Sequence, residues 1–122
     1  MLNSENLIKL FLSNFPEFEI DFKQHIEDYE EILLHVFFGE TLNEKLIELL
    51  RDEKIHKDEI SKIFNFLEKV AVEGDLDTKE VLTVTILERL GDNKKLLETS
   101  YKYMGKNTKI ASREIEEFWG RC

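Results

Sequence analysis

Residues that break or cross-link a chain are scarce in this sequence. Pro16 is its one proline, and Cys122, at the last position, is its one cysteine. A lone cysteine cannot close an intrachain disulfide, which predicts a reducing compartment. No basic start followed by an apolar stretch indicates a secretory signal, and no apolar run approaches the length of a membrane span. We therefore expect a cytoplasmic protein with no membrane partner.

Signatures of catalysis and of metal or cofactor binding are also missing from the sequence. The serines lack the context of a nucleophile elbow, and no glycine-rich loop precedes a helix with a phosphate-binding lysine. Glu53 and His56 have the spacing of half a carboxylate di-iron site, but no second pair exists. Asp75 and Asp77 begin like a calcium loop that lacks its later ligands. We predict that the protein is not an enzyme and has no catalytic residue, metal or cofactor.

The remaining histidines and aromatic residues favour structural roles. His25 and His35 have no neighbours at ligand spacing, so we interpret them as buried or half-buried imidazoles with satisfied hydrogen bonds. Tyr101, Tyr103 and Trp119 recur at helical spacing, which is more typical of a core than of a binding surface.

Apolar residues recur with the period of an α-helix along most of the chain, and β-branched alternation is nearly absent. The length of 122 residues predicts one domain, spanning residues 1–122. The pattern predicts an all-α protein, either an irregular helical bundle or a short stack of antiparallel helical hairpins. About seven helices are expected, with a possible break at 29–31 that would divide the second into two. Their expected ranges are 4–14, 17–38, 41–52, 58–73, 77–90, 93–104 and 108–119.

Glycines and short polar residues mark the predicted helix ends. The last four glycines are spaced by one helix plus a turn, which favours the left-handed position after a helix. Thr41 with Glu44, and Asp77 with Glu80, have the spacing of an N-terminal capping box. Asp92 follows Gly91 and is expected to cap the next helix.

Negative charge is concentrated in the first 31 residues. Eight carboxylates and two lysines give this segment a formal charge of −6, out of −9 for the whole chain. An asymmetric field of this kind biases which partners approach and how fast. It argues against nucleic acid and anionic lipid and favours a cationic partner. A sparse set of bases in the last third is too weak for a nucleic-acid site in a chain of pI 4.9.

A single helix over residues 17–31 would place four of these acids on one line along its surface, while its apolar residues face the core. We predict that this acidic surface binds the partner. Its candidate residues are Glu17, Asp21, Glu27, Asp28, Glu30 and Glu31, of which Glu17, Asp21, Asp28 and Glu31 form the line. The alternative is an ordinary solvated helix face.

The stretch His-Ile-Glu-Asp-Tyr-Glu-Glu-Ile-Leu-Leu-His-Val-Phe-Phe-Gly-Glu at residues 25–40, with the later stretch Val81 to Gly91, resembles small helical immunity proteins of bacteria. Those proteins belong to contact-dependent inhibition and polymorphic toxin systems. The resemblance implies a cytoplasmic antidote that binds one cognate toxin, frequently a basic RNase or DNase, over or beside its active site. It assigns no binding residue to a numbered position.

Two functions follow as hypotheses. The first is an immunity protein that inhibits a cationic toxin domain stoichiometrically, with an RNase favoured, through the acidic surface. The second is a helical-repeat adaptor that binds a partner helix or peptide in an apolar groove formed with Phe37 and Phe38. Binding that weakens with salt, and a toxin gene directly upstream, would favour the first. The oligomeric state is left open.

Overall fold

The computed structural model describes residues 1–121 and is all-α. Cys122, on which the expectation of a reducing compartment depends, lies outside the described residues. The helical elements are α1 (Ser4–Asn14), the 3-10 turn η1 (Pro16–Phe18), α2 (Glu19–Tyr29), α3 (Leu34–Glu40), α4 (Leu42–Arg51), α5 (Lys57–Glu73), α6 (Leu76–Glu80), the π-helical segment η2 (Val81–Leu87), α7 (Glu88–Gly91), α8 (Lys94–Tyr101) and α9 (Lys106–Phe118).

Hydrophobic periodicity located most helices to within a few residues. The segments α6, η2 and α7 follow one another without a gap and together occupy the range predicted as one helix over 77–90. Helix α8 ends at Tyr101, three residues before its predicted end, and a turn follows it. Extended backbone contributes one isolated parallel bridge between Leu2 and Gly74 within residues 1–121. The all-α fold class is confirmed.

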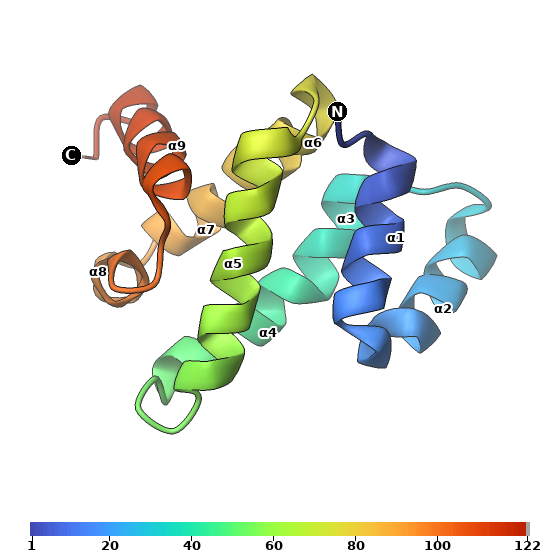
Figure 1. Cartoon of the computed structure of the whole chain (residues 1–122), viewed down its shortest axis with the longest axis horizontal. Helices are drawn as coiled ribbons and strands as arrows, with labels where there is room; N and C mark the ends of the chain where they lie inside the picture. The colour runs from blue at the N-terminus through green and yellow to red at the C-terminus, as the bar shows by residue number, and fades with distance from the viewer. Residues whose placement is uncertain (122) are drawn as a thin grey trace.

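The range 17–38 contains two helices, because the backbone reverses after Tyr29. Glu30 has a φ of 59°, the left-handed conformation that a residue with a side chain adopts at a cost of roughly 1–2 kcal/mol. The loop that follows carries Ile32 and Leu33 to the start of α3. Helix α2 and helix α3 can therefore point in different directions, as Figure 1 shows.

The helix starts differ from the predicted caps. The Thr41 hydroxyl donates to a carbonyl four residues earlier and does not cap α4, so the capping box predicted there is wrong. Helix α6 is capped by Asp75 rather than Asp77, and α8 by Asn93 rather than Asp92. In both true caps the side-chain oxygen accepts the backbone N–H three residues further on.

Most of the glycines provide space and not a left-handed backbone. Among the described residues, Gly120 is the one glycine with a positive φ, at 65°. At Gly105 an added Cβ would lie 2.5 Å from the carboxyl carbon of Glu68, and at Gly91 it would lie 2.0 Å from a carboxylate oxygen of Glu116. These glycines allow carboxylates of neighbouring helices to approach the backbone closely.

A cluster of phenylalanines forms the centre of the core in the N-terminal half. Phe11 is completely buried and has five other phenylalanine rings within 4.9–5.8 Å of its ring centre. Aromatic pairs at such distances add about 0.5–1.5 kcal/mol each beyond their buried area. One partner directly follows α1, and the others come from η1, α3 and α5. The five partners are Phe15, Phe18, Phe37, Phe38 and Phe66.

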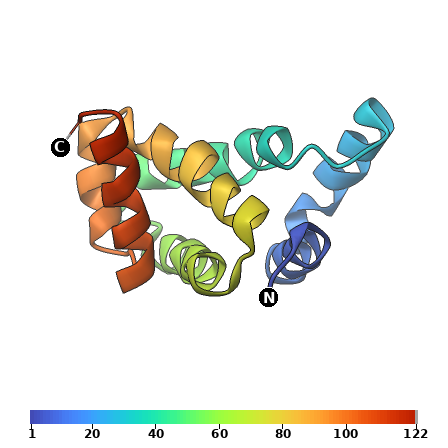
Figure 2. The ribbon, with the colours of Figure 1, turned by 90° about the horizontal axis from the view of Figure 1, so that it is seen from above.

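The elements form an irregular bundle whose two ends differ. Helices α1 and α2 lie at one end of the longest axis and α8 and α9 at the other, with α5 passing between them (Figure 1). Seen from above, α6 and α7 run across the molecule between α3 and α5 (Figure 2). The acidic N-terminal segment therefore occupies one end of the molecule.

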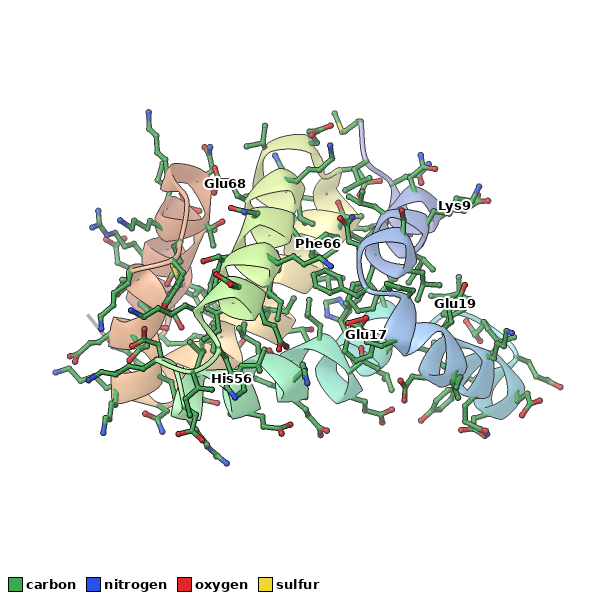
Figure 3. The ribbon with its side chains drawn as sticks, turned by 60° about the horizontal axis from the view of Figure 1, so that its bottom comes forward. Lys9, Glu17, Glu19, His56, Phe66 and Glu68 are labelled. Atoms are coloured by element: carbon green, nitrogen blue, oxygen red, sulfur yellow. The ribbon has the colours of Figure 1, made fainter. Side chains whose placement is uncertain are left out.

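Glu68 of α5 holds the beginning of α9. Its carboxylate accepts the backbone N–H groups of Asn107 and Thr108 at 3.1 and 2.9 Å, and both of their side chains at 2.8 Å. Burial raises the pKa of the Glu68 carboxyl, but these hydrogen bonds outweigh it, so the pKa is lowered from 4.5. A carboxylate at a helix N-terminus also interacts favourably with the helix dipole. Figure 3 labels Glu68 on the ribbon of α5.

We expect Glu68→Gln to lower the free energy of unfolding by about 1–2 kcal/mol at neutral pH, because the N-terminus of α9 loses its charged acceptor. A lowered folded-state pKa contributes stability above the unfolded value, and this stability is lost as the pH falls through the folded value. The variant should therefore lose stability less steeply in acid than the wild type. Urea unfolding across this pH range measures both effects. The exposed Glu98→Gln is the control, and equal behaviour of the two variants would contradict the role of Glu68.

Candidate partner-binding surface

The six predicted acidic residues are all exposed at the α2 end of the molecule. Glu17 lies in η1, whereas Asp21, Glu27 and Asp28 lie on α2. The remaining two, Glu30 and Glu31, follow the end of α2. Figure 3 labels Glu17 and Glu19 near the start of this helix. We define these six residues as the acidic surface.

The predicted line of four carboxylates is wrong at its C-terminal end. Glu31 lies beyond α2 and does not continue the helical repeat, because the helix ends at Tyr29. Asp21 and Asp28, seven residues apart, do share a face. Between them, the Gln24 amide donates to the Asp28 carboxylate at 2.9 Å, so a neutral side chain spaces the two acids.

Neighbouring bases do not neutralise the acidic surface. Within residues 1–121, none of its six carboxylates lies within 4.0 Å of a lysine, arginine or histidine nitrogen. The ion pairs that do form join Lys9 to Glu5 on α1, or lie beyond residue 52. The field of these carboxylates therefore extends into solvent, reduced by Lys23 on the same helix and screened by salt.

The inner face of α2 is attached to the core and to the following loop. Phe18 and Phe22 pack against the core, and His25 is 4% exposed. The His25 Nε2 accepts the backbone N–H of Leu33 at 2.9 Å, which assigns the proton of the neutral ring to Nδ1. The prediction of a satisfied, buried imidazole is confirmed for His25, and this bond fixes the loop that carries Glu30 and Glu31.

The other two histidines and the Glu53–Tyr103 pair lie outside the acidic surface. His35 is exposed, so the prediction of a buried or half-buried imidazole is wrong there. Its Nδ1 still lies 2.6 Å from the Thr85 hydroxyl. Glu53 accepts a hydrogen bond from the Tyr103 hydroxyl, which raises the pKa of Tyr103 to about 12 and lowers that of Glu53. His56 stands directly before α5. No group of three or more metal-ligating side chains occurs in the part of the chain that the structure describes.

Two expectations about aromatic side chains are wrong. Phe37 and Phe38 are 1% exposed and form part of the core, so they cannot line the groove predicted for an adaptor. Trp119 is 51% exposed and lies beside Phe118 at the end of α9, so it is not a core residue. Tyr101 and Tyr103 are partly buried against the core, as expected.

An apolar groove does lie beside the acidic surface, on a segment whose apolar periodicity predicts a helix over 17–38. Its volume is about 440 Å³, and we name it the Ile32 groove. Its lining comes from three separate parts of the chain: Ser4 of α1, residues 32–36, and Asp77, Glu80 and Val81. The apolar run Ile32-Leu33-Leu34 was visible in the sequence. The pairing of this run with residues 77–81 was not, because it depends on the reversal at Glu30.

The chain belongs to a family described as a domain of unknown function (DUF7674). Residues 8–120 match the sequence model of this family. No curated protein and no solved structure is significantly similar to the chain. None of the helices in residues 1–121 combines the length and apolar character that crossing a membrane requires.

We expect His25→Phe to lower the free energy of unfolding by about 1 kcal/mol, because the ring still packs but the Leu33 N–H loses its acceptor. Hydrogen exchange at the Leu33 amide should become faster at the same time. Tyr29→Phe is the matched control, since the Tyr29 ring packs against His25 with the ring centres 4.8 Å apart and the substitution keeps that ring. Unchanged exchange at Leu33 in His25→Phe would show that this hydrogen bond does not hold the loop.

Proposed function

We propose that this chain is a cytoplasmic, non-catalytic immunity protein that neutralises a cationic toxin domain by binding it one to one. A nuclease that holds phosphates with lysines and arginines is the expected target, with an RNase favoured. The observation that carries the proposal is the acidic surface, whose carboxylates are exposed, lie at one end of the molecule and form no ion pair within residues 1–121.

The charge of this surface suits a partner whose function requires basic residues. Asp21 and Asp28 would pair with cations that otherwise contact RNA or DNA phosphates. Complementary fields mainly accelerate association and exclude wrong partners, and they contribute less to affinity. The same field disfavours nucleic acid and anionic membranes as partners.

The backbone that carries the acidic surface is also held by contacts with the rest of the fold. Phe18 and Phe22 fix the inner side of η1 and α2 against the core, and His25 fixes the loop after α2. A rigid surface loses little conformational entropy on binding, which favours tight association. Repulsion between the like charges is a cost that a cationic partner would relieve.

Titration calorimetry against the product of the adjacent upstream gene tests this proposal. We expect a one-to-one complex that weakens as salt rises. In stopped-flow mixing, Asp21→Lys with Asp28→Lys should lower the association rate by about tenfold. The control is Glu98→Lys with Glu117→Lys, on exposed residues of α8 and α9. It changes the net charge of the chain by the same amount as the α2 double variant.

Equal effects of the two double variants would show that net charge, and not the acidic surface, governs binding. Binding that ignores both salt and the α2 reversals would contradict the proposed interface. Circular dichroism of each variant establishes that the helices remain folded.

A helical adaptor is the second candidate, and the Ile32 groove is the observation that favours it. The groove is apolar, as recognition of a partner helix requires. Tight binding of a partner without salt dependence would favour this function over the first.

A further inference from the structure

We propose that the Ile32 groove binds a basic amphipathic helix of the partner protein, with apolar anchors in the groove and lysines or arginines on its rim. This inference rests on the proposed function and identifies the part of the partner that this chain recognises. It also gives a role to a groove that the acidic surface alone does not use.

The floor of the groove is made of aliphatic side chains that the core leaves incompletely covered. Ile32 is 38% exposed, and Leu33, Leu34 and Val36 are half-buried, whereas Val81 is buried at the base. The volume of about 440 Å³ lies within the range of roughly 300–1,000 Å³ typical of occupied pockets. Filling it with aliphatic side chains would remove this apolar surface from water.

Elements around the groove hold it open without an occupant. His25 fixes the Leu33 backbone on one side. On the other side, the Leu2 backbone pairs with the turn between α5 and α6, and Asp75 caps the helix that carries the groove wall. Since the walls are tied to separate parts of the fold, the groove is preformed for a ligand.

The charges on the rim select a basic occupant. Asp77 and Glu80 line one wall, no lysine or arginine lines the groove, and neither acid pairs with a base among residues 1–121. The other wall begins at Ile32, and Glu30 and Glu31 directly precede it in the chain. The Cα atom of Glu31 is therefore about 3.8 Å from that of Ile32. Carboxylates therefore line one wall of the groove, and two more directly precede the other wall in the chain.

Comparison with a neighbouring groove shows that this charge pattern is not general. The groove between α5, α6 and α9 has a volume of about 330 Å³ and is also partly apolar. Its lining includes both Lys79 and Glu114, so its rim carries charges of both signs. A second copy of the chain is a poor occupant for the Ile32 groove, because each copy carries a formal charge of −9.

An amphipathic helix presents apolar anchors at i, i+3, i+4 and i+7 and can carry bases along both flanks. Such a segment would place its anchors against Ile32 and Val81, and its bases beside Asp77 and Glu80. The acidic surface would then guide the partner electrostatically, and the groove would hold it.

The test uses three synthetic peptides titrated into isotopically labelled protein and followed by the backbone amide spectrum. The first has leucines at helical anchor positions and lysines elsewhere. In the second, serines replace the leucines, and in the third, glutamates replace the lysines. We expect the leucine–lysine peptide alone to shift the amides of residues 32–36 and 77–81.

Ile32→Ser should weaken binding of the leucine–lysine peptide by about tenfold, as for loss of one anchor contact. Asp77→Asn with Glu80→Gln should weaken it by about three- to tenfold. The matched control, Glu98→Gln with Glu117→Gln, removes the same charge from exposed positions and should leave binding unchanged.

Shifts confined to α2 or to the groove around Leu76, or equal binding of the serine–lysine peptide, would overturn the groove inference. Neither outcome would affect the proposed function. Equal binding of the leucine–glutamate peptide, or no binding of any peptide, would also overturn a basic occupant. The proposed function fails separately, when reversal of Asp21 and Asp28 leaves the toxin titration unchanged.

Discussion

The arrangement of the N-terminal half depends on the packing around Phe11. This ring is fully buried and lies against phenylalanines of η1, α3 and α5. Because Phe37 and Phe38 must reach this cluster, α3 cannot continue in the direction of α2. The chain accepts the cost of a left-handed residue at Glu30 to make the turn. Burial of two aromatic rings, at about 1.5–3 kcal/mol each, exceeds that cost.

That turn creates both features on which the proposed function depends. The turn ends α2, whose carboxylates face solvent. It also places Ile32 in the same groove as Asp77 and Glu80 of α6, the helix that starts at Leu76. The hydrogen bond from the Leu33 N–H to His25 then fixes the loop in place. The acidic surface and the wall of the groove at residues 32–36 are therefore consecutive in the chain and share the contact of His25 with Leu33. A cationic partner with apolar residues could use both.

The sequence predicted the features that depend on local periodicity and on charge counts. Helix positions, the single all-α fold and the exposure of residues such as Asp21 and Asp28 follow from these patterns. The break at Glu30 was one of two alternatives, because no proline or glycine marks it and its neighbours favour a helix. Hydrogen bonding and packing in the folded chain determined the rest. The Thr41 hydroxyl donates to the Phe37 carbonyl instead of capping α4, and Gly105 makes room for the Glu68 carboxylate of α5. The groove could not be predicted, since its walls are distant in sequence.

Protection of growing cells tests the central claim most directly. The chain is co-expressed with the toxic domain encoded directly upstream, and growth is compared with that of cells carrying the toxic domain alone. The account predicts that the wild type and the Glu98→Lys, Glu117→Lys variant restore growth, whereas Asp21→Lys with Asp28→Lys, produced at the same level, restores it less. Failure of the wild type to protect, or full protection by the α2 reversal, would contradict it.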